Sequence, residues 1–196
     1  YAEEACRDNQ RENARRILRL TDNFNAICQS QSVCHSEAYL QGVPSALMTE
    51  EAFFYDLVVH GFHGVYSHDD DAEIKALTDV LDHTVTPFLI VPQSYKPLER
   101  VLICFDGSVS AARAMKDFAP LAQEADFEIT VLSSHSDPVK ARYFLNRAES
   151  YLSGYDVGKI RKVETKTPIR KAVREELDEA PDLIVLGANS RHSVRD

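Results

Sequence analysis

Three histidines and three aspartates gather in one short stretch of the chain. His60, His63 and His68 are followed directly by residues 69–71, all of them aspartate. Imidazole nitrogens and carboxylate oxygens are common ligands of zinc and related ions. The spacing matches no established metal motif, however, and turns are naturally polar. We therefore interpret the stretch as a polar loop and predict no metal site.

Two further groups of reactive side chains have simple interpretations. Cys34 and His35 are adjacent, and neighbouring residues of a strand point to opposite faces, so a thiol–imidazole pair is not predicted. Arg191, His192 and Arg195 form a basic cluster that would suit a phosphate group. A solvent-exposed loop explains the same cluster equally well.

An acid, a glycine and a serine follow the apolar run at residues 101–105. Asp106, Gly107 and Ser108 are typical of a strand-to-helix turn in which the serine caps the helix. The carboxyl end of a parallel strand is also where doubly wound sheets bind ligands. Spacing alone leaves both interpretations open.

The elements that would position such residues occur twice. Residues 56–61 and 182–187 each form a short apolar run that ends on a glycine, and the two runs share Asp, Leu, Val and Gly at equivalent positions. In both cases a helical pattern that starts at a proline, Pro44 or Pro168, leads into the run. Each run indicates a buried parallel strand that opens into a tight turn.

The spacing of the two runs indicates a duplicated domain. They lie 126 residues apart, whereas solenoid and propeller repeats have periods of about 20–50 residues. Two full copies would need 252 residues, and the chain has 196. We therefore expect both ends of the chain to lie inside domains. A polar linker around Pro97 divides a first domain, residues 1–96, from a second, residues 97–196.

Hydrophobic periodicity predicts alternating helices and strands. The predicted helices are residues 2–20, 44–54, 74–81, 109–122, 139–152 and 169–177. The predicted strands are residues 32–40, 56–60, 87–92, 101–105, 127–133, 159–167 (an edge strand) and 182–186. Val109, Val139 and Tyr143 are predicted to face inward, and Pro120 to kink or end its helix early. This alternation predicts right-handed crossovers and parallel sheets.

Composition excludes several classes of protein. The net charge of −9 and the pI near 5.3 argue against binding to nucleic acid or to an anionic membrane. No apolar run approaches the roughly 20 residues that span a bilayer. The four cysteines, Cys6, Cys28, Cys34 and Cys104, show no CxxC spacing, which favours reduced thiols and a cytoplasmic location.

Taken together, these features resemble the universal stress protein family in its tandem two-domain form. The resemblance is carried by strand 101–105 running into Asp106-Gly-Ser, by the doubled strand and glycine, and by the proline-bracketed strand 87–92. It implies an α/β fold of doubly wound parallel sheets with strand order 3-2-1-4-5. It also implies two tandem domains, each of them incomplete. It also implies a stress-response protein without catalysis, with domain pairing within the chain or a homodimer.

The resemblance further implies an adenine nucleotide, ATP or AMP with Mg²⁺, in the second domain. Nucleotide-binding members carry G-x-x-G and then G-[S/T] after the fourth strand, where glycines let backbone amides approach phosphate oxygens. Asp106 would lie by the ribose or adenine, and Ser133 or Ser134 would line the adenine pocket. The implied nucleotide-binding residues are Phe105, Asp106, Gly107, Ser108, Ser133, Ser134, Leu186, Gly187, Asn189 and Ser190.

Both copies depart from the family pattern. In the first domain Gly61, His63 and Gly64 fit and are weaker candidates, but Ile74 stands where G-[S/T] would begin. The neighbouring aspartates would repel a polyphosphate. In the second domain Ser190 replaces a glycine. The alternative hypothesis is therefore a degenerate module that dimerises or acts as a scaffold. A nucleotide-hydrolysing enzyme ranks last, because the chain has no P-loop.

Overall fold

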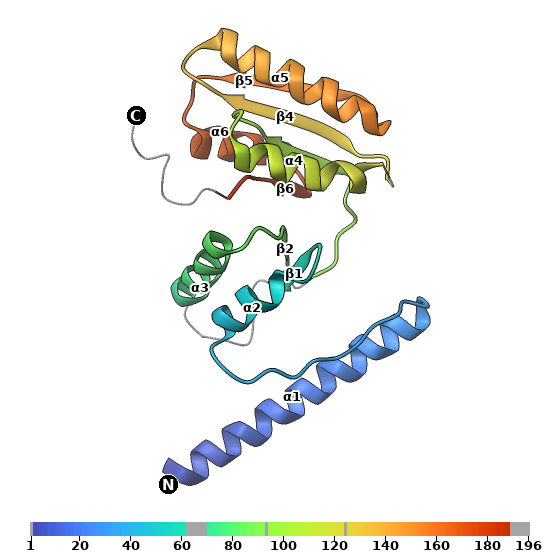
Figure 1. Ribbon diagram of the computed structural model, residues 1–196, viewed down its shortest axis with the longest axis vertical. Coiled ribbons are helices and arrows are strands. Elements are labelled where there is room, and N and C mark those ends of the chain that lie inside the picture. Colours follow the sequence, from blue (N-terminus) through green and yellow to red (C-terminus); the bar gives the residue numbers. More distant parts are fainter. Residues whose placement is uncertain (1, 62–69, 93, 124, 189–196) are drawn as a thin grey trace. The chain divides into compact units, whose positions relative to one another are not determined.

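The structure is a computed structural model that describes all residues except 1, 62–69, 93, 124 and 189–196 (Figure 1). The chain divides into two compact units, Tyr1–Gln41 and Gly42–Asp196, and each is described by itself. In chain order the elements are α1 (Ala2–Ser30), α2 (Pro44–Ala52), β1 (Val58–Gly61), α3 (Asp70–His83), β2 (Phe88–Val91), β3 (Arg100–Cys104), α4 (Val109–Ala122), β4 (Glu128–Ser134), α5 (Pro138–Leu152), η1 (Ser153–Tyr155), β5 (Ile160–Thr165), α6 (Ile169–Glu176), η2 (Leu177–Glu179) and β6 (Leu183–Val185).

The first unit is one long helix followed by an extended segment. Helix α1 continues ten residues beyond the predicted end, and the strand predicted at residues 32–40 is wrong, since these residues form no strand. Side chains hold the segment instead. The amide of Asn25 donates to Glu37, its oxygen lies 2.7 Å from His35 Nε2, and the Phe24 ring contacts the His35 imidazole edge-on. A strand forms only when its backbone hydrogen-bonds to another strand. The described part of this unit contains helix α1 but no second strand.

The second unit begins with a two-stranded parallel sheet. Strands β1 and β2 pair in parallel, with Val58 opposite Phe88, and helices α2 and α3 pack against each other. Val80 and Ala52 are buried, and the Thr86 hydroxyl donates to the Ala52 carbonyl over 2.5 Å. The predicted strand, helix and strand after Pro44 are therefore present in the predicted order.

A four-stranded parallel sheet follows, with the order β5-β4-β3-β6. Counted from β3 along the chain, this order is 3-2-1-4. The predicted α/β class with parallel sheets is thus confirmed, and β5 lies at an edge as expected. A fifth strand is not among the described residues of this sheet. The tandem arrangement and the boundary after residue 96 stay predictions.

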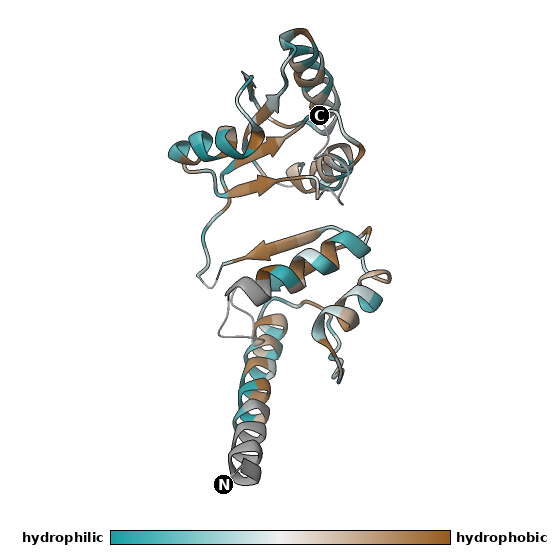
Figure 2. Cartoon of the chain, turned by 90° about the vertical axis from the view of Figure 1, so that its left-hand side faces the viewer, coloured by the Kyte–Doolittle hydropathy of each residue, from teal (hydrophilic) through white to brown (hydrophobic). Residues whose placement is uncertain are grey.

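Helices cover both faces of this sheet (Figure 1). Helices α4 and α5 bury one face of it together with the apolar residues of β3 and β4, and α6 covers part of the other face. Several strands of this part of the chain are hydrophobic (brown in Figure 2), whereas edge strand β5 carries Arg161, Lys162 and Glu164. Because both faces are covered, β3 has the continuous apolar run that is typical of an internal parallel strand.

Three side chains of α4 and α5 that were predicted to face inward do not face inward. Val109, Val139 and Tyr143 are exposed by 71%, 72% and 60%. The buried positions of α5 are instead Ala141, Leu145, Ala148 and Leu152, a helical spacing centred on small and unbranched residues. Helix α4 reaches Ala122, its predicted end, so Pro120 does not stop it early. The alternative effect predicted for Pro120, a kink, stays a prediction.

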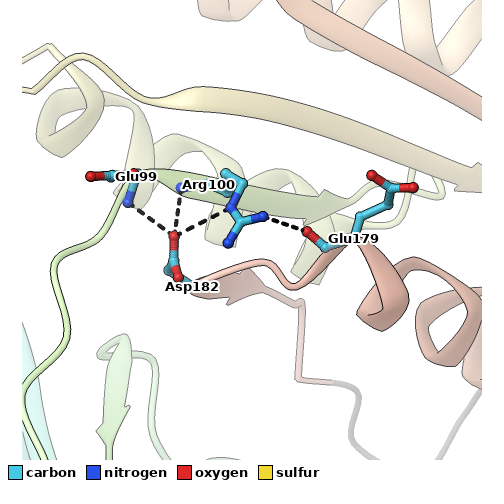
Figure 3. A network of polar contacts seen from close by, with 4 residues as sticks. All are labelled: Glu99, Arg100, Glu179 and Asp182. Carbon is cyan, nitrogen blue, oxygen red and sulfur yellow. Dashed lines mark hydrogen bonds and ion pairs between the residues drawn. The ribbon is translucent and has the colours of Figure 1, made fainter.

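A polar network ties the amino ends of β3 and β6 together (Figure 3). Asp182 Oδ2 accepts hydrogen bonds from the backbone amides of Glu99 (3.2 Å) and Arg100 (3.0 Å), and the Arg100 guanidinium lies 3.8 Å away. Arg100 also donates to the Glu179 carbonyl over 2.9 Å. The aspartate of the second repeat therefore fixes how β6 begins. Asp56, its counterpart, is exposed and bonds to no other described residue.

Asp182 makes the stability of the protein depend on pH. Hydrogen bonds from the amides of Arg100 and Glu99 hold the pKa of this carboxyl below its usual value. A lowered pKa means that the stabilisation is present at neutral pH and is lost as the pH falls through the native pKa. We expect Asp182→Asn to be destabilising at pH 7 and less destabilising at pH 3.

Urea unfolding of both proteins across that pH range measures this difference. Asp56→Asn is the matched control, since it alters the same motif position without such bonds. An Asp182→Asn effect that stays constant from pH 7 to pH 3 would contradict the assignment.

Candidate functional site

The turn after β3 has the geometry of a capped helix start. The Ser108 amide donates to Asp106 Oδ1 over 2.8 Å, and the Ser108 hydroxyl accepts from the Ala111 amide over 3.2 Å. Gly107 has φ +81°, a conformation that disfavours residues with a Cβ atom. The predicted cap at Ser108 is confirmed. Asp106 is exposed, so the outer part of its carboxylate faces solvent at the carboxyl end of the sheet.

Gly187 touches the same region from β6. A Cβ atom on Gly187 would lie 2.3 Å from the Ala111 nitrogen and 2.5 Å from the Ser110 carbonyl carbon. These distances are shorter than any normal contact, so only glycine lets the end of β6 pass the first turn of α4. The structure therefore brings together two motifs that are about 80 residues apart in the sequence. Leu186, which precedes Gly187, is exposed.

The end of β4 presents two serines with different environments. Ser134 donates its hydroxyl to the Thr167 carbonyl over 2.6 Å. Ser133 is fully buried, and its hydroxyl has no hydrogen-bond partner among the described residues. Successive residues of a strand point to opposite faces, so Ser133 points to the face covered by α4 and α5. Phe105 lies beside this strand end, because its amide donates to the Leu132 carbonyl over 2.9 Å.

The two serines yield opposite predictions for stability. A buried hydroxyl without a partner is unfavourable, so we expect Ser133→Ala to raise the free energy of unfolding by about 1 kcal/mol. Ser134→Ala is the control, because it removes a hydrogen bond and should lower the same quantity by about 1 kcal/mol. Urea denaturation of the two single variants measures both. A loss of stability in Ser133→Ala would show that the hydroxyl has a partner after all.

Sequence reasoning missed the aromatic side chain that lies against this turn. Phe144 of α5 packs on Gly107 and contacts the rings of Phe105 and His135, at centroid distances of 6.1 and 6.2 Å. The prediction placed Tyr143, its neighbour, on the inward face. The helical spacing of Ala141, Leu145 and Ala148 is the signal that would have predicted the buried face of α5 correctly. It would also have placed residue 144 near the sheet.

Cys104 precedes the turn but offers no reactive thiolate. Burial raises the pKa of its thiol to about 12, and the carboxylates of Asp106 and Glu176 add to the effect. The group is therefore protonated at neutral pH. Cys28 and Cys34 are free thiols as well, as expected, and the side chain of Cys6 lies outside the described residues.

Several predicted residues lie outside the part of the chain that the structure describes. These are His63, Gly64, Asn189 and Ser190, together with His68 and the basic residues after 190. Gly61 ends β1, and a Cβ atom there would meet no described atom within 4 Å. Among the described residues, no three His, Cys, Asp or Glu side chains are arranged to hold a metal ion. Within the same residues, no helix is long and apolar enough to cross a membrane.

One pocket, of about 210 Å³, lies at the opposite, amino end of the sheet. Its lining includes Arg100, Thr130, Arg161 and Glu176. The Arg161 guanidinium pairs with Glu176 and donates to the Thr130 hydroxyl over 3.1 Å. None of the predicted site residues lines this pocket, so it is not the site that the sequence predicts.

Comparison with known proteins gives similarities of structure. No protein-family model matches the sequence, and no curated protein matches it significantly. Similar solved structures include a protein from Mycobacterium tuberculosis H37Rv (22% identity, TM-score 0.43, covering 52% of this chain and 79% of that one). A universal stress protein in complex with cAMP is 15% identical (TM-score 0.40, 46% and 77%). A protein of the universal stress protein family from Burkholderia pseudomallei is 24% identical (TM-score 0.37, 45% and 80%).

Proposed function

We propose that this chain is a non-enzymatic stress-response protein of the universal stress protein type, and that residues 97–196 bind an adenine nucleotide, ATP or AMP with Mg²⁺. The observation that carries the proposal is the contact of Gly187 with the first turn of α4 beside Asp106. It brings the glycine after the fourth strand against the helix that follows the acid after the first strand. The carboxyl edge of a parallel sheet, between neighbouring strands, is where doubly wound folds bind ligands.

The two sides of this contact suit different parts of a nucleotide. The first turn of α4 has backbone amides that no carbonyl of the helix accepts, and the helix dipole favours an anion there. This end would receive the phosphates, with Gly187, Asn189 and Ser190 supplying close backbone approach. The exposed carboxylate of Asp106 uses Oδ1 for the turn, which leaves Oδ2 for a ribose hydroxyl.

The base would lie at the end of β4. Ser133 and Phe105 are there, and an aromatic and apolar lining with a sheltered hydroxyl suits a planar base with a polar edge. Gly61, His63 and Gly64 of the first half are weaker candidates, because the aspartates beside them repel phosphate.

Isothermal titration calorimetry of the purified chain with ATP and AMP, each with and without Mg²⁺, tests the proposal. cAMP belongs in the same panel, because a similar solved structure holds it. We expect binding that Asp106→Asn weakens, since this substitution keeps an acceptor for the turn but removes the charge. Asp182→Asn, at the other end of the sheet, should leave the affinity unchanged. No heat with any nucleotide, at protein concentrations that detect micromolar binding, would refute the proposal.

A degenerate module that dimerises or acts as a scaffold is the second candidate. The packing of Phe144 against Gly107 favours it, because an aromatic ring fills the space beside the turn. Mass spectrometry of small molecules released from freshly purified protein separates the two candidates. A retained nucleotide excludes the degenerate module, whereas empty protein that sediments as a dimer supports it.

A further inference from the structure

The side chain of Phe144 closes the space between the carboxyl ends of β3 and β4. A Cβ atom on Gly107 would lie 2.3 Å from Phe144 Cε1 and 2.4 Å from Cζ, so the ring is in van der Waals contact with the glycine itself. Phe105 meets the same ring at an interplanar angle of 87°, and the His135 ring lies on another side. The ring is therefore enclosed by the turn after β3 and the end of β4.

A buried hydroxyl without a hydrogen-bond partner among the described residues lies on the neighbouring strand, where the Phe105 amide meets the end of β4. Ser133 lies on the face of β4 that also carries Ile129 and Val131, both of them buried in the core beneath α4 and α5. Phe144 packs against this core from α5. Buried polar groups in proteins almost always have a hydrogen-bond partner. A hydroxyl without a described partner, in a region closed by one side chain, points to a ligand group that reaches it when the region opens.

We propose that Phe144 is a gate at the base end of the nucleotide site, and this inference rests on the function proposed above. In the closed state the ring lies on Gly107, as in this structure. An entering adenine displaces the ring, occupies the space beside Gly107 and forms a hydrogen bond with the hydroxyl of Ser133. Since only the open state binds, the apparent affinity is lower than the intrinsic affinity by the open fraction.

The orientation of the ring distinguishes a gate from a stacking platform. The Gly107 Cβ position lies 2.3, 2.4 and 2.8 Å from Cε1, Cζ and Cδ1, distances that place it over the face of the ring. The face therefore lies directly on the glycine and leaves no room for a base between them. A stacking platform would leave its face open to the base. Phe144 blocks that space, and its removal should help the base to enter.

Nucleotide affinities of Phe144 variants test the gate. We expect Phe144→Ala to bind AMP about two- to tenfold more tightly than the unmodified chain, which is the range expected for loss of one or two ring contacts in the closed state. Phe144→Leu, which keeps an apolar side chain at this position, should bind with intermediate affinity. Val139→Ala alters an exposed residue of the same helix and should leave the affinity unchanged.

Weaker binding by both Phe144 variants would show a platform and overturn the gate. Thermal unfolding of each variant identifies a loss of binding that comes only from a loss of folded protein. Phe144→Leu decides the question if Phe144→Ala does not fold.

A fluorescent reporter tests the movement independently of affinity. The chain has no tryptophan, so Phe144→Trp places a single indole at the gate. We expect its emission maximum to shift to longer wavelength when AMP is added, because the ring leaves a closed apolar region for water. A shift to shorter wavelength, or an unchanged maximum at saturating AMP, contradicts the gate.

Failure of the gate can be told apart from failure of the site. If the unmodified chain binds AMP and the Phe144 variants bind it equally well, the gate is wrong and the nucleotide site stands. If neither the unmodified chain nor any variant binds ATP, AMP or cAMP, the proposed function is wrong and the gate fails with it.

Discussion

The Gly187→Ala substitution should lower the free energy of unfolding by about 2–3 kcal/mol, the range for overpacking a well-packed site. The added methyl group would lie 2.3 Å from the Ala111 nitrogen and 2.8 Å from its Cα. Both are backbone atoms, so no side-chain rotation relieves the overlap. Either the end of β6 or the first turn of α4 must move. Urea denaturation measures the loss as a lower midpoint with an unchanged slope.

Gly61→Ala is the matched control, because Gly61 holds the equivalent position in the first copy of the motif. A Cβ atom there meets no described atom within 4 Å, and its φ is not in the left-handed region. We expect the control to be neutral or to stabilise the protein by up to about 1 kcal/mol, since alanine restricts the unfolded chain. Equal losses in both variants would mean that the strand-end glycines matter for the backbone alone and not for the contact with α4.

Comparison of Gly187→Ala with Gly61→Ala separates two roles of a strand-end glycine, the backbone turn and the close contact with a helix. The sequence alone could not separate these roles. Both glycines follow the same apolar pattern, and pattern predicts a strand and a turn in each case. Among the described residues, a helix packs against Gly187 and none contacts the Cβ position of Gly61. Asp56 and Asp182 differ in the same way. Asp182 accepts hydrogen bonds from the amides that open β3, whereas Asp56 bonds to no described residue although β2 pairs with β1.

Periodicity was a sufficient guide to the parallel strands of the four-stranded sheet. Strands β3, β4 and β6 have apolar runs, β5 has an alternating pattern, and each lies within two residues of its predicted bounds. The segment at residues 32–40 has strand-like residues but no described strand to pair with, and it lies along α1 instead. Strand formation depends on a partner as well as on propensity, and a partner cannot be read from the segment itself.

The sequence predicted the parts of the candidate site that neighbouring residues form. It did not predict the parts that depend on packing between distant elements. The cap at Ser108 and the bend at Gly107 follow from residue type, because the chemistry of a turn lies within a few residues. The buried state of Ser133 depends on helices packed over the sheet. The approach of Phe144 to Gly107 depends on the rotation of α5, and the exposed Val139 and Tyr143 show that large apolar residues did not identify its inward face.

The contact between Gly107 and Phe144 makes a second large effect testable. Alanine at φ +81° costs about 1–2 kcal/mol in backbone strain alone, and its methyl group would overlap the Phe144 ring. We therefore expect Gly107→Ala to lower the free energy of unfolding by about 2 kcal/mol or more. Gly154→Ala is the control, since a Cβ atom there meets no described atom within 4 Å.

A double-mutant cycle divides this loss between the backbone and the ring. In a Phe144→Ala background the methyl group of Ala at position 107 has room, so Gly107→Ala should cost only the strain of its φ angle. We expect the two substitutions to be less than additive by about 0.5–2 kcal/mol, a usual range for residues in contact. Urea denaturation of the two single variants and the double variant gives the coupling. Strict additivity would show that the ring yields freely to the methyl group, and the closed position of Phe144 would then contribute nothing to the stability of the turn.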